Sequence, residues 1–149
     1  MKEQVSHRTQ IISNKHWVLF DGSCGLCHWA VQFIVKRDLN KMFCFAPLAS
    51  AVGQKLCEAH GLNTTEAFSD SVVLIPPNEA YYTRSEAALQ ILKQLPKWRA
   101  LAFLMQFFPN FVLDLTYEWV AKNRIKWFGS KNHCSIQDFP KGICYKDQL

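Results

Sequence analysis

The sequence predicts a single α/β domain in which a small mixed β-sheet is flanked by helices, with additional helices toward the C-terminus. Two short apolar runs separated by a helical pattern indicate a parallel crossover unit. Two later runs separated by a proline-containing turn indicate an antiparallel hairpin. The chain has 149 residues, of which 49% are hydrophobic and 19% are charged, so its size and composition are those of one globular domain.

The first strand and the first helix are the most clearly indicated elements. The run "HWVLFDG" (16–22) ends in Asp-Gly, as expected of a buried strand followed by a turn. Apolar residues then recur at helical spacing over 25–37. Lys36 and Arg37 lie in the last turn of this expected helix, where positive charge suits the helix dipole.

Three further runs complete the expected sheet. The segment "KMFCFAPL" (41–48) predicts a second strand, and a helix over 49–60 follows it. Gly61 is expected to close this helix. The segments "DSVVLIP" (70–76) and "EAYYTR" (79–84) predict the third and fourth strands, which form the hairpin.

The C-terminal half is expected to be helical. Ser85 is a good N-cap for the helix "EAALQILKQL", and two more helices are expected over roughly 98–108 and 111–127. Polar residues and a proline interrupt the apolar stretch over 100–115, so we expect no membrane-spanning helix there. We expect a buried helical hairpin that bends at the Pro-Asn pair of this stretch.

The chain divides into a polar N-terminal extension (1–15), the domain with its C-terminal helices (16–130) and an irregular tail (131–149). The extension lacks the apolar core and the small-residue cleavage site of a signal peptide, which predicts a cytoplasmic protein. The net charge is +5, and part of the excess lies among aromatic residues over 121–131. Because so short a basic run is more typical of a solvated helix end, we expect no nucleic-acid partner.

A C-x-x-C pair, Cys24 and Cys27, carries the chemistry that the sequence predicts. It lies where the first expected strand gives way to the first helix. Unpaired N–H groups and the positive end of the helix dipole favour a thiolate at that place. A side chain at i+3 lies on the same helix face, so Cys27 can reach back to Cys24. We predict that Cys24 attacks a disulfide and that Cys27 resolves the mixed disulfide.

Two polar neighbours of this pair have alternative interpretations. Asp21 could cap N–H groups at the helix start, or it could accept a proton from Cys27 during resolution, so we place it with the catalytic residues. His28 could stabilise a thiolate if it is protonated, or it could point outward from the helix.

Four more cysteines are present outside the motif. Cys44 and Cys57 fall in an expected strand and an expected helix, where a free cysteine is commonly a small buried hydrophobic side chain. Cys134 and Cys144 fall in the tail, where they could pair with each other or provide an additional resolving or sensing thiol.

Three segments of the chain resemble the DCC family of thiol-disulfide oxidoreductases, which is named for D-x-x-C-x-x-C. In "FDGSCGLC", Asp21, Cys24 and Cys27 occupy those letters. The segment "SEAALQILKQLPKW" resembles the middle of the family pattern, and "YEWVAKNRIKWFG" resembles its closing stretch. The resemblance extends over roughly 17–134 and implies a thioredoxin-like fold.

The closing stretch contains Tyr117 and Arg124, which are seven residues apart and share a helix face. Both match family positions, but packing and surface pairing explain them adequately, so we leave them outside the predicted site. The motif departs from that of ordinary thioredoxins, because Ser23 replaces a tryptophan and Leu26 replaces a proline. The segment before the third strand also lacks the cis-proline of thioredoxins.

Three alternatives to thiol-disulfide exchange would use the same C-x-x-C motif or the same fold. C-x-x-C-H is also the attachment motif of a c-type haem, but haem attachment takes place outside the cytoplasm and the N-terminus carries no export signal. A zinc site would need ligands beyond Cys24 and Cys27, and His133 and Cys134 could supply them only through a long closure. A non-catalytic thioredoxin-like binding module would keep the fold without the chemistry.

We therefore predict an enzyme that exchanges thiols and disulfides through Cys24 and Cys27, with Asp21 in its site and without a metal or organic cofactor. Its expected partners are a disulfide-containing protein or a small disulfide as substrate, and a reductant that recycles the enzyme. The direction of the reaction depends on the reduction potential of the pair relative to its partners.

Overall fold

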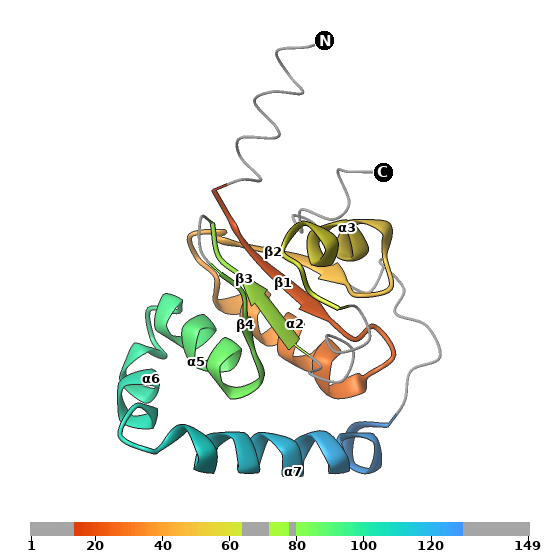
Figure 1. Ribbon diagram of the computed structural model, residues 1–149. Coiled ribbons are helices and arrows are strands. Elements are labelled where there is room, and N and C mark those ends of the chain that lie inside the picture. Colours follow the sequence, from red (N-terminus) through yellow and green to blue (C-terminus); the bar gives the residue numbers. More distant parts are fainter. Residues whose placement is uncertain (1–13, 64–71, 78–79, 130–149) are drawn as a thin grey trace.

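Four short strands form one mixed sheet with the order β2-β1-β3-β4 (Figure 1). In the computed structural model β1 is parallel to β2 and antiparallel to β3, and β4 pairs antiparallel with β3. The strands are β1 (His16–Phe20), β2 (Phe43–Pro47), β3 (Val72–Ile75) and β4 (Tyr82–Thr83). The sheet therefore combines the predicted parallel crossover unit with the predicted antiparallel hairpin.

The structure describes residues 14–63, 72–77 and 80–129. Most of the predicted N-terminal extension lies outside these residues, and so does the predicted tail with Cys134 and Cys144. The division of the chain into an extension, a domain and a tail therefore stays a prediction.

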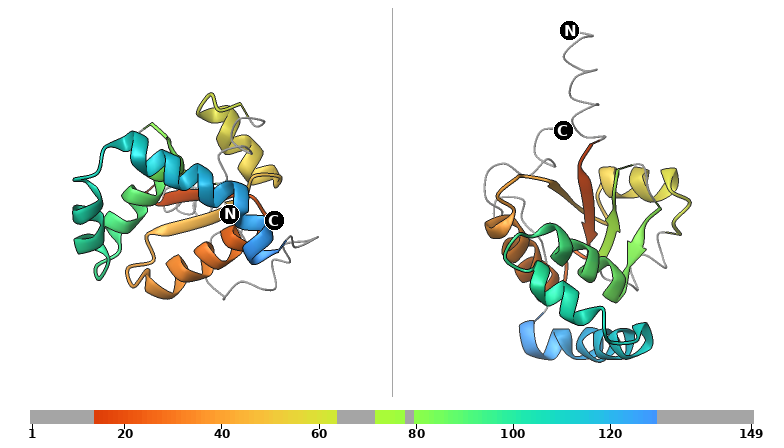
Figure 2. Two further views of the ribbon diagram at one scale, coloured as in Figure 1. Left: turned by 90° about the horizontal axis from the view of Figure 1, so that it is seen from below. Right: turned by 90° about the vertical axis from the view of Figure 1, so that its left-hand side faces the viewer.

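Both faces of the sheet are covered by helices, because the apolar side chains of each strand alternate between two hydrophobic clusters (Figure 2). Val18 and Phe20 of β1 belong to the cluster with α2 and α5, whereas Trp17 and Leu19 belong to the cluster with α3. The helices on the two faces are α2 (Gly25–Arg37), α5 (Arg84–Gln94) and α3 (Ala51–Ala59). Burial on both faces explains why the strands appear in the sequence as nearly continuous apolar runs.

Two helices after α5 form a bent pair, α6 (Arg99–Met105) and α7 (Asn110–Phe128). They are bent by 113° at the break that contains Pro109, so the predicted bend is confirmed. The predicted burial of this pair is wrong, because α6 buries only Ala102 and α7 buries no residue of its own. The two helices lie along the edge of the domain (Figure 1), where their outer sides stay exposed.

Large exposed apolar side chains gather on α6, on the bend and on α7. They are Leu101, Phe103, Leu104, Phe107, Phe108, Phe111, Leu115, Trp119, Ile125, Trp127 and Phe128. Within the described part of the chain, no helix by itself has the length and hydropathy to cross a membrane, and α6 and α7 reach that threshold only when they are counted together across their bend.

The start of α5 differs from the sequence-based expectation. The helix begins at Arg84, its N-cap position is Thr83, and Thr83 makes no side-chain capping hydrogen bond. The expected N-cap, Ser85, therefore lies inside the first turn. Its hydroxyl donates a hydrogen bond to the carboxylate of Asp114, so it joins α5 to α7. A partner on another helix, which no local pattern reveals, explains why the capping prediction is wrong.

Candidate active site

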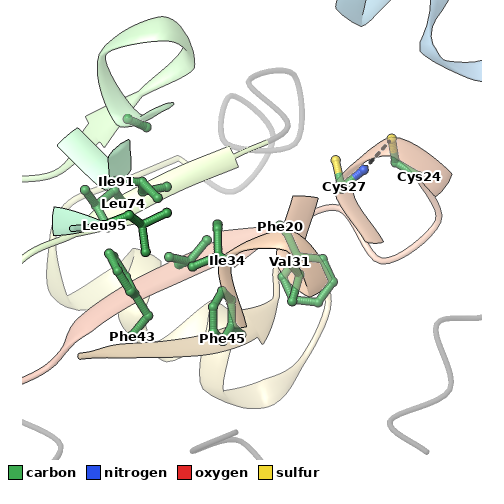
Figure 3. Close-up of a cluster of buried hydrophobic side chains, with 12 residues drawn as sticks. Phe20, Cys24, Cys27, Val31, Ile34, Phe43, Phe45, Leu74, Ile91 and Leu95 are labelled. Carbon is green, nitrogen blue, oxygen red and sulfur yellow. Dashed lines mark hydrogen bonds between the residues drawn. The ribbon is translucent and has the colours of Figure 1, made fainter. Parts of the chain in front are cut away.

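The two cysteines of the motif lie at the start of α2, immediately after the turn that follows β1. Cys24 is the N-cap residue of this helix, and its Sγ accepts a hydrogen bond from the backbone N–H of Cys27 at 3.4 Å (Figure 3, dashed line). The backbone N–H of Cys24 donates to the carbonyl oxygen of Asp21 at 3.3 Å, which closes the turn. A sulfur therefore occupies the place of the usual capping oxygen, where negative charge is favoured.

The two thiols differ strongly in acidity. A hydrogen bond from the side chain of Cys27 is the largest influence on Cys24, and it is assisted by backbone N–H groups and by the positive charge of Arg124. Together these outweigh burial and lower the pKa of Cys24 to about 6. The same hydrogen bond, followed by burial and by the negative charge on Cys24, raises the pKa of Cys27 far above its usual range. At neutral pH the reduced pair is thus a Cys24 thiolate beside a Cys27 thiol.

Both sulfurs are covered, since Cys24 is 4% exposed and Cys27 is 3% exposed. The C-terminal end of α7 reaches the start of α2 at Gly25. A Cβ atom placed on Gly25 would lie 2.5 Å from the carbonyl oxygen of Phe128 and 3.0 Å from that of Gly129. Glycine is therefore required at position 25 by the close approach of α7 to the dithiol turn.

Asp21 connects the dithiol turn to α7. Its Oδ1 accepts hydrogen bonds from the backbone N–H of Ser23 at 3.0 Å and from the Ser23 hydroxyl at 2.7 Å. Its Oδ2 lies 3.7 Å from a guanidinium nitrogen of Arg124, and both side chains are mostly buried. The structure thus places Asp21 beside the pair, with its carboxylate engaged by the turn and by Arg124 of α7.

Arg124, which the sequence analysis left outside the predicted site, lies close enough to the dithiol to act on it. Its charge lowers the pKa of both thiols, and it forms the ion pair with Asp21. The signal was its match to a family position on the helix face that it shares with Tyr117, although packing and surface pairing also account for that match. What the sequence could not show was that this face turns toward the dithiol.

Of the two alternatives for His28, the one in which it points outward is wrong. The side chain is buried, with 7% exposed, and its Nε2 lies 3.1 Å from Nε2 of Gln32 one turn later. A contact along the same helix suits a packing role, so we do not include His28 in the site.

The cysteines outside the motif behave differently from one another. Cys44 and Cys57 are both fully buried, as expected. Cys57 is a free thiol whose pKa is raised by burial and, to a lesser extent, by Glu58. Cys44 is disulfide-bonded, so the expectation of a free buried thiol is wrong there. Its partner is not among the described residues, in which Cys24, Cys27 and Cys57 are free.

The described residues contain no group of three or more His, Cys, Asp or Glu side chains that could hold a metal ion. The additional ligands that a zinc site would need, His133 and Cys134, lie outside the described part of the chain.

A dithiol of unequal acidity at a helix N-terminus, set on a small mixed sheet with helices on both faces, defines an α/β protein of the thioredoxin-like class. Residues 18–130 match the family described as DCC1-like thiol-disulfide oxidoreductase. Because the match covers most of the chain, the protein belongs to this family, as the resemblance had implied.

Two proteins of similar sequence agree with this family assignment. The chain is 45% identical over 120 residues to "Uncharacterized protein YuxK" of Bacillus subtilis (strain 168), which covers 80% of this chain and 85% of that protein. It is 40% identical over 120 residues to "DCC family protein At1g52590, chloroplastic" of Arabidopsis thaliana, which covers 80% of this chain and 68% of that protein. No solved structure matches the chain.

Proposed function

We propose that the protein is an enzyme that exchanges its C-x-x-C dithiol with the disulfide of a substrate. The observation that carries this proposal is the unequal acidity of Cys24 and Cys27, which makes one sulfur a nucleophile and keeps the other protonated. Membership of the DCC1-like thiol-disulfide oxidoreductase family supports it.

The reaction runs in two displacements. The Cys24 thiolate attacks one sulfur of the substrate disulfide, which forms a mixed disulfide and releases the other sulfur as a thiolate that takes up a proton. Cys27 then loses its proton and attacks Sγ of Cys24, which releases the second substrate thiol. The substrate gains two electrons, and the enzyme is left with a Cys24–Cys27 disulfide. A dithiol or monothiol reductant then reduces this disulfide and regenerates the dithiol form of the enzyme. The same steps in reverse would oxidise a substrate.

The coupling between the thiols sets the order of these steps. Two influences that hold the pKa of Cys27 high are its hydrogen bond to Cys24 and the charge on Cys24. Both disappear when Cys24 enters a mixed disulfide, whereas the positive charge of Arg124 remains. Cys27 therefore becomes more acidic only after the first displacement, when it is needed as a nucleophile.

Asp21 acts in this scheme as a positioning residue. Its carboxylate holds the turn through Ser23 and orients the guanidinium of Arg124. Since its oxygens are engaged in these contacts, we propose that it positions the turn and Arg124 and does not take the proton of Cys27 directly. Its own negative charge also helps to keep the pKa of Cys27 high.

The test combines redox titration with three variants. The purified protein is equilibrated with glutathione buffers, and its cysteines are mapped by mass spectrometry. We expect a reversible Cys24–Cys27 disulfide with a midpoint between roughly −120 and −270 mV, the range of dithiol enzymes. Cys24→Ser should abolish exchange, and Cys27→Ser should accumulate a mixed disulfide on Cys24. Cys57→Ser is the matched control, because Cys57 is a free buried thiol in α3.

Two outcomes would contradict the proposal. If Cys24→Ser keeps full exchange activity, Cys24 is not the nucleophile. If the pair is unreactive across the whole potential range, the domain is a thioredoxin-like binding module, or a zinc-stabilised domain where stoichiometric zinc accompanies the protein. Metal analysis of protein purified without chelators separates the last two.

The cytoplasmic location stays a prediction from the sequence. A disulfide-bonded Cys44 is more typical of an oxidising compartment, and one relative carries "chloroplastic" in its name. Rapid alkylation of intact cells followed by mass spectrometry measures the oxidation state of Cys44. A reduced Cys44 is expected in the cytoplasm, and a fully oxidised one would place the protein in an oxidising compartment.

A further inference from the structure

A cavity of about 270 Å³ lies beside the dithiol, between α2, α5 and α7. Cys27 forms part of its wall on α2, while Ala88 on α5 and Ala121 on α7 line it from the other helices. Figure 3 shows apolar side chains that also line it, among them Ile34 and Ile91. The sulfur that completes the proposed reaction is thus part of the cavity wall.

The lining of this cavity is almost entirely hydrocarbon. Apart from Cys27, polar atoms can come only from Trp29, Tyr117 and Arg124, and every other lining side chain is aliphatic or phenyl. The cavity is partly open to solvent, but its wall offers water few of the two to four polar partners that an ordered water molecule needs, so a small apolar molecule is favoured over water against it. An apolar ligand would restore the contacts that the empty space lacks.

The arrangement of α7 restricts what can reach the sulfurs. The C-terminal end of α7 lies against Gly25, and the two thiols are almost fully covered. A disulfide held in the surface of a folded protein would have to open this cover before it could meet either sulfur. A small apolar molecule needs less room, because its apolar group can occupy the cavity as far as Cys27, so that only its disulfide has to reach Cys24 one helical turn away.

We propose that the cavity binds the apolar group of a small disulfide substrate, which the neighbouring dithiol then reduces. This inference rests on the proposed function and names its substrate class. The Cys24 thiolate forms a bond to one substrate sulfur, and the other sulfur leaves and is protonated. Cys27 then forms the Cys24–Cys27 disulfide and releases the second apolar thiol. One disulfide and two thiols are consumed, and one disulfide and two thiols are formed.

The first experiment compares two neutral substrates of the same length, dipropyl disulfide and bis(2-hydroxyethyl) disulfide. They differ only in a terminal methyl group against a hydroxyl group on each arm. The rate constants with the reduced protein are divided by those with free N-acetylcysteine thiolate, which removes the intrinsic reactivity of each disulfide. We expect this corrected ratio to favour dipropyl disulfide by about tenfold or more, because a hydrocarbon pocket offers a hydroxyl group no partner.

Variants that fill the cavity provide the second arm. Ala88→Leu and Ala121→Leu enter it from opposite helices, and each should reduce the preference for dipropyl disulfide, with the double variant reducing it most. Two independent positions keep the test informative if one variant does not fold. Ala59→Leu is the matched control, because Ala59 is exposed at the end of α3 on the other face of the sheet.

Binding without chemistry is measured with benzene as the probe. In the Cys24→Ser variant, which retains the cavity wall, saturating benzene should raise the melting temperature by about 2–4 °C. Adding Ala88→Leu and Ala121→Leu to that variant should abolish the shift. Equal corrected rates for the two disulfides, together with no benzene shift, would overturn the substrate assignment and leave the proposed function intact. Absence of exchange with either disulfide would instead overturn the proposed function, and with it the substrate assignment.

Discussion

Replacement of Cys27 by alanine should move the titration of Cys24 upward from about pH 6, toward the value of 9.0 for a free thiol. The hydrogen bond from the side chain of Cys27 is the largest influence that lowers the pKa of Cys24. Alanine removes it and keeps the backbone N–H that also reaches the sulfur. Cys27→Ser is the matched control, because its hydroxyl can still donate to the thiolate and should hold the titration lower than alanine does.

The size of this effect decides which assay can detect it. At pH 7 a thiol that titrates at about 6 is about 90% thiolate, and one that titrates at 9.0 is about 1% thiolate. Thiolate nucleophilicity rises with pKa, however, and over this range it increases about twentyfold. The two effects largely cancel, so the reaction rate at a single pH would fall only a few times and would be a poor measure.

The informative quantity is the midpoint of the whole pH profile. The protein is alkylated with iodoacetamide across the pH range, and modification of Cys24 is followed by mass spectrometry. A midpoint that moves upward in Cys27→Ala, together with a faster plateau, is the expected result. A midpoint that stays near pH 6 would refute the reasoning, because the helix terminus and Arg124 would then be sufficient to make Cys24 acidic.

Three further predictions concern the surroundings of the dithiol. Arg124→Gln should raise the midpoint of the Cys24 alkylation profile by less than Cys27→Ala does, because the charge of Arg124 influences Cys24 less than the Cys27 hydrogen bond does. Arg124→Lys, which keeps the charge, should restore the midpoint. An unchanged midpoint in Arg124→Gln would contradict this prediction. Gly25→Ala should push the end of α7, at Phe128, away from the dithiol turn and lower the free energy of unfolding by about 1–3 kcal/mol. Urea unfolding measures this, and faster alkylation of Cys24 should accompany it. Stability of the reduced protein should rise between about pH 6 and 9, because Cys24 is more acidic when folded and the unfolded chain therefore binds more protons. The slope is at most about 1.4 kcal/mol per pH unit, and Cys24→Ser should lack it.

Much of the fold was predictable because its signals are local. Burial of β1 and β2 on both faces produces short continuous apolar runs, and the amphipathic pattern of α2 follows directly after the first of them. The position of Cys24 at the start of α2 follows from the same change, since Cys24 lies where the apolar run of β1 has ended and helical spacing begins. Spacing alone then placed Cys27 one turn later, so the centre of the candidate site could be proposed from the sequence.

The errors share a different cause, which is that each depends on a partner distant in the chain. Ser85 has the residue type of an N-cap, but its hydroxyl is bound to Asp114 of α7. The apolar stretch around Pro109 has the composition of a buried hairpin, but the domain offers no surface to cover its outer side. Cys44 resembles an ordinary buried thiol, but it is disulfide-bonded.

The sequence by itself determined the sheet, its crossover helix and the placement of a dithiol at a helix N-terminus, because strand burial, helical period and helix polarity act between near neighbours. Only the tertiary structure decided that the end of α7 lies against the dithiol turn at Gly25, that Arg124 pairs with Asp21 beside it, and that an apolar cavity reaches Cys27. These features arise where segments about a hundred residues apart in the chain meet. The local pattern of one segment does not predict which face of the other segment it will contact.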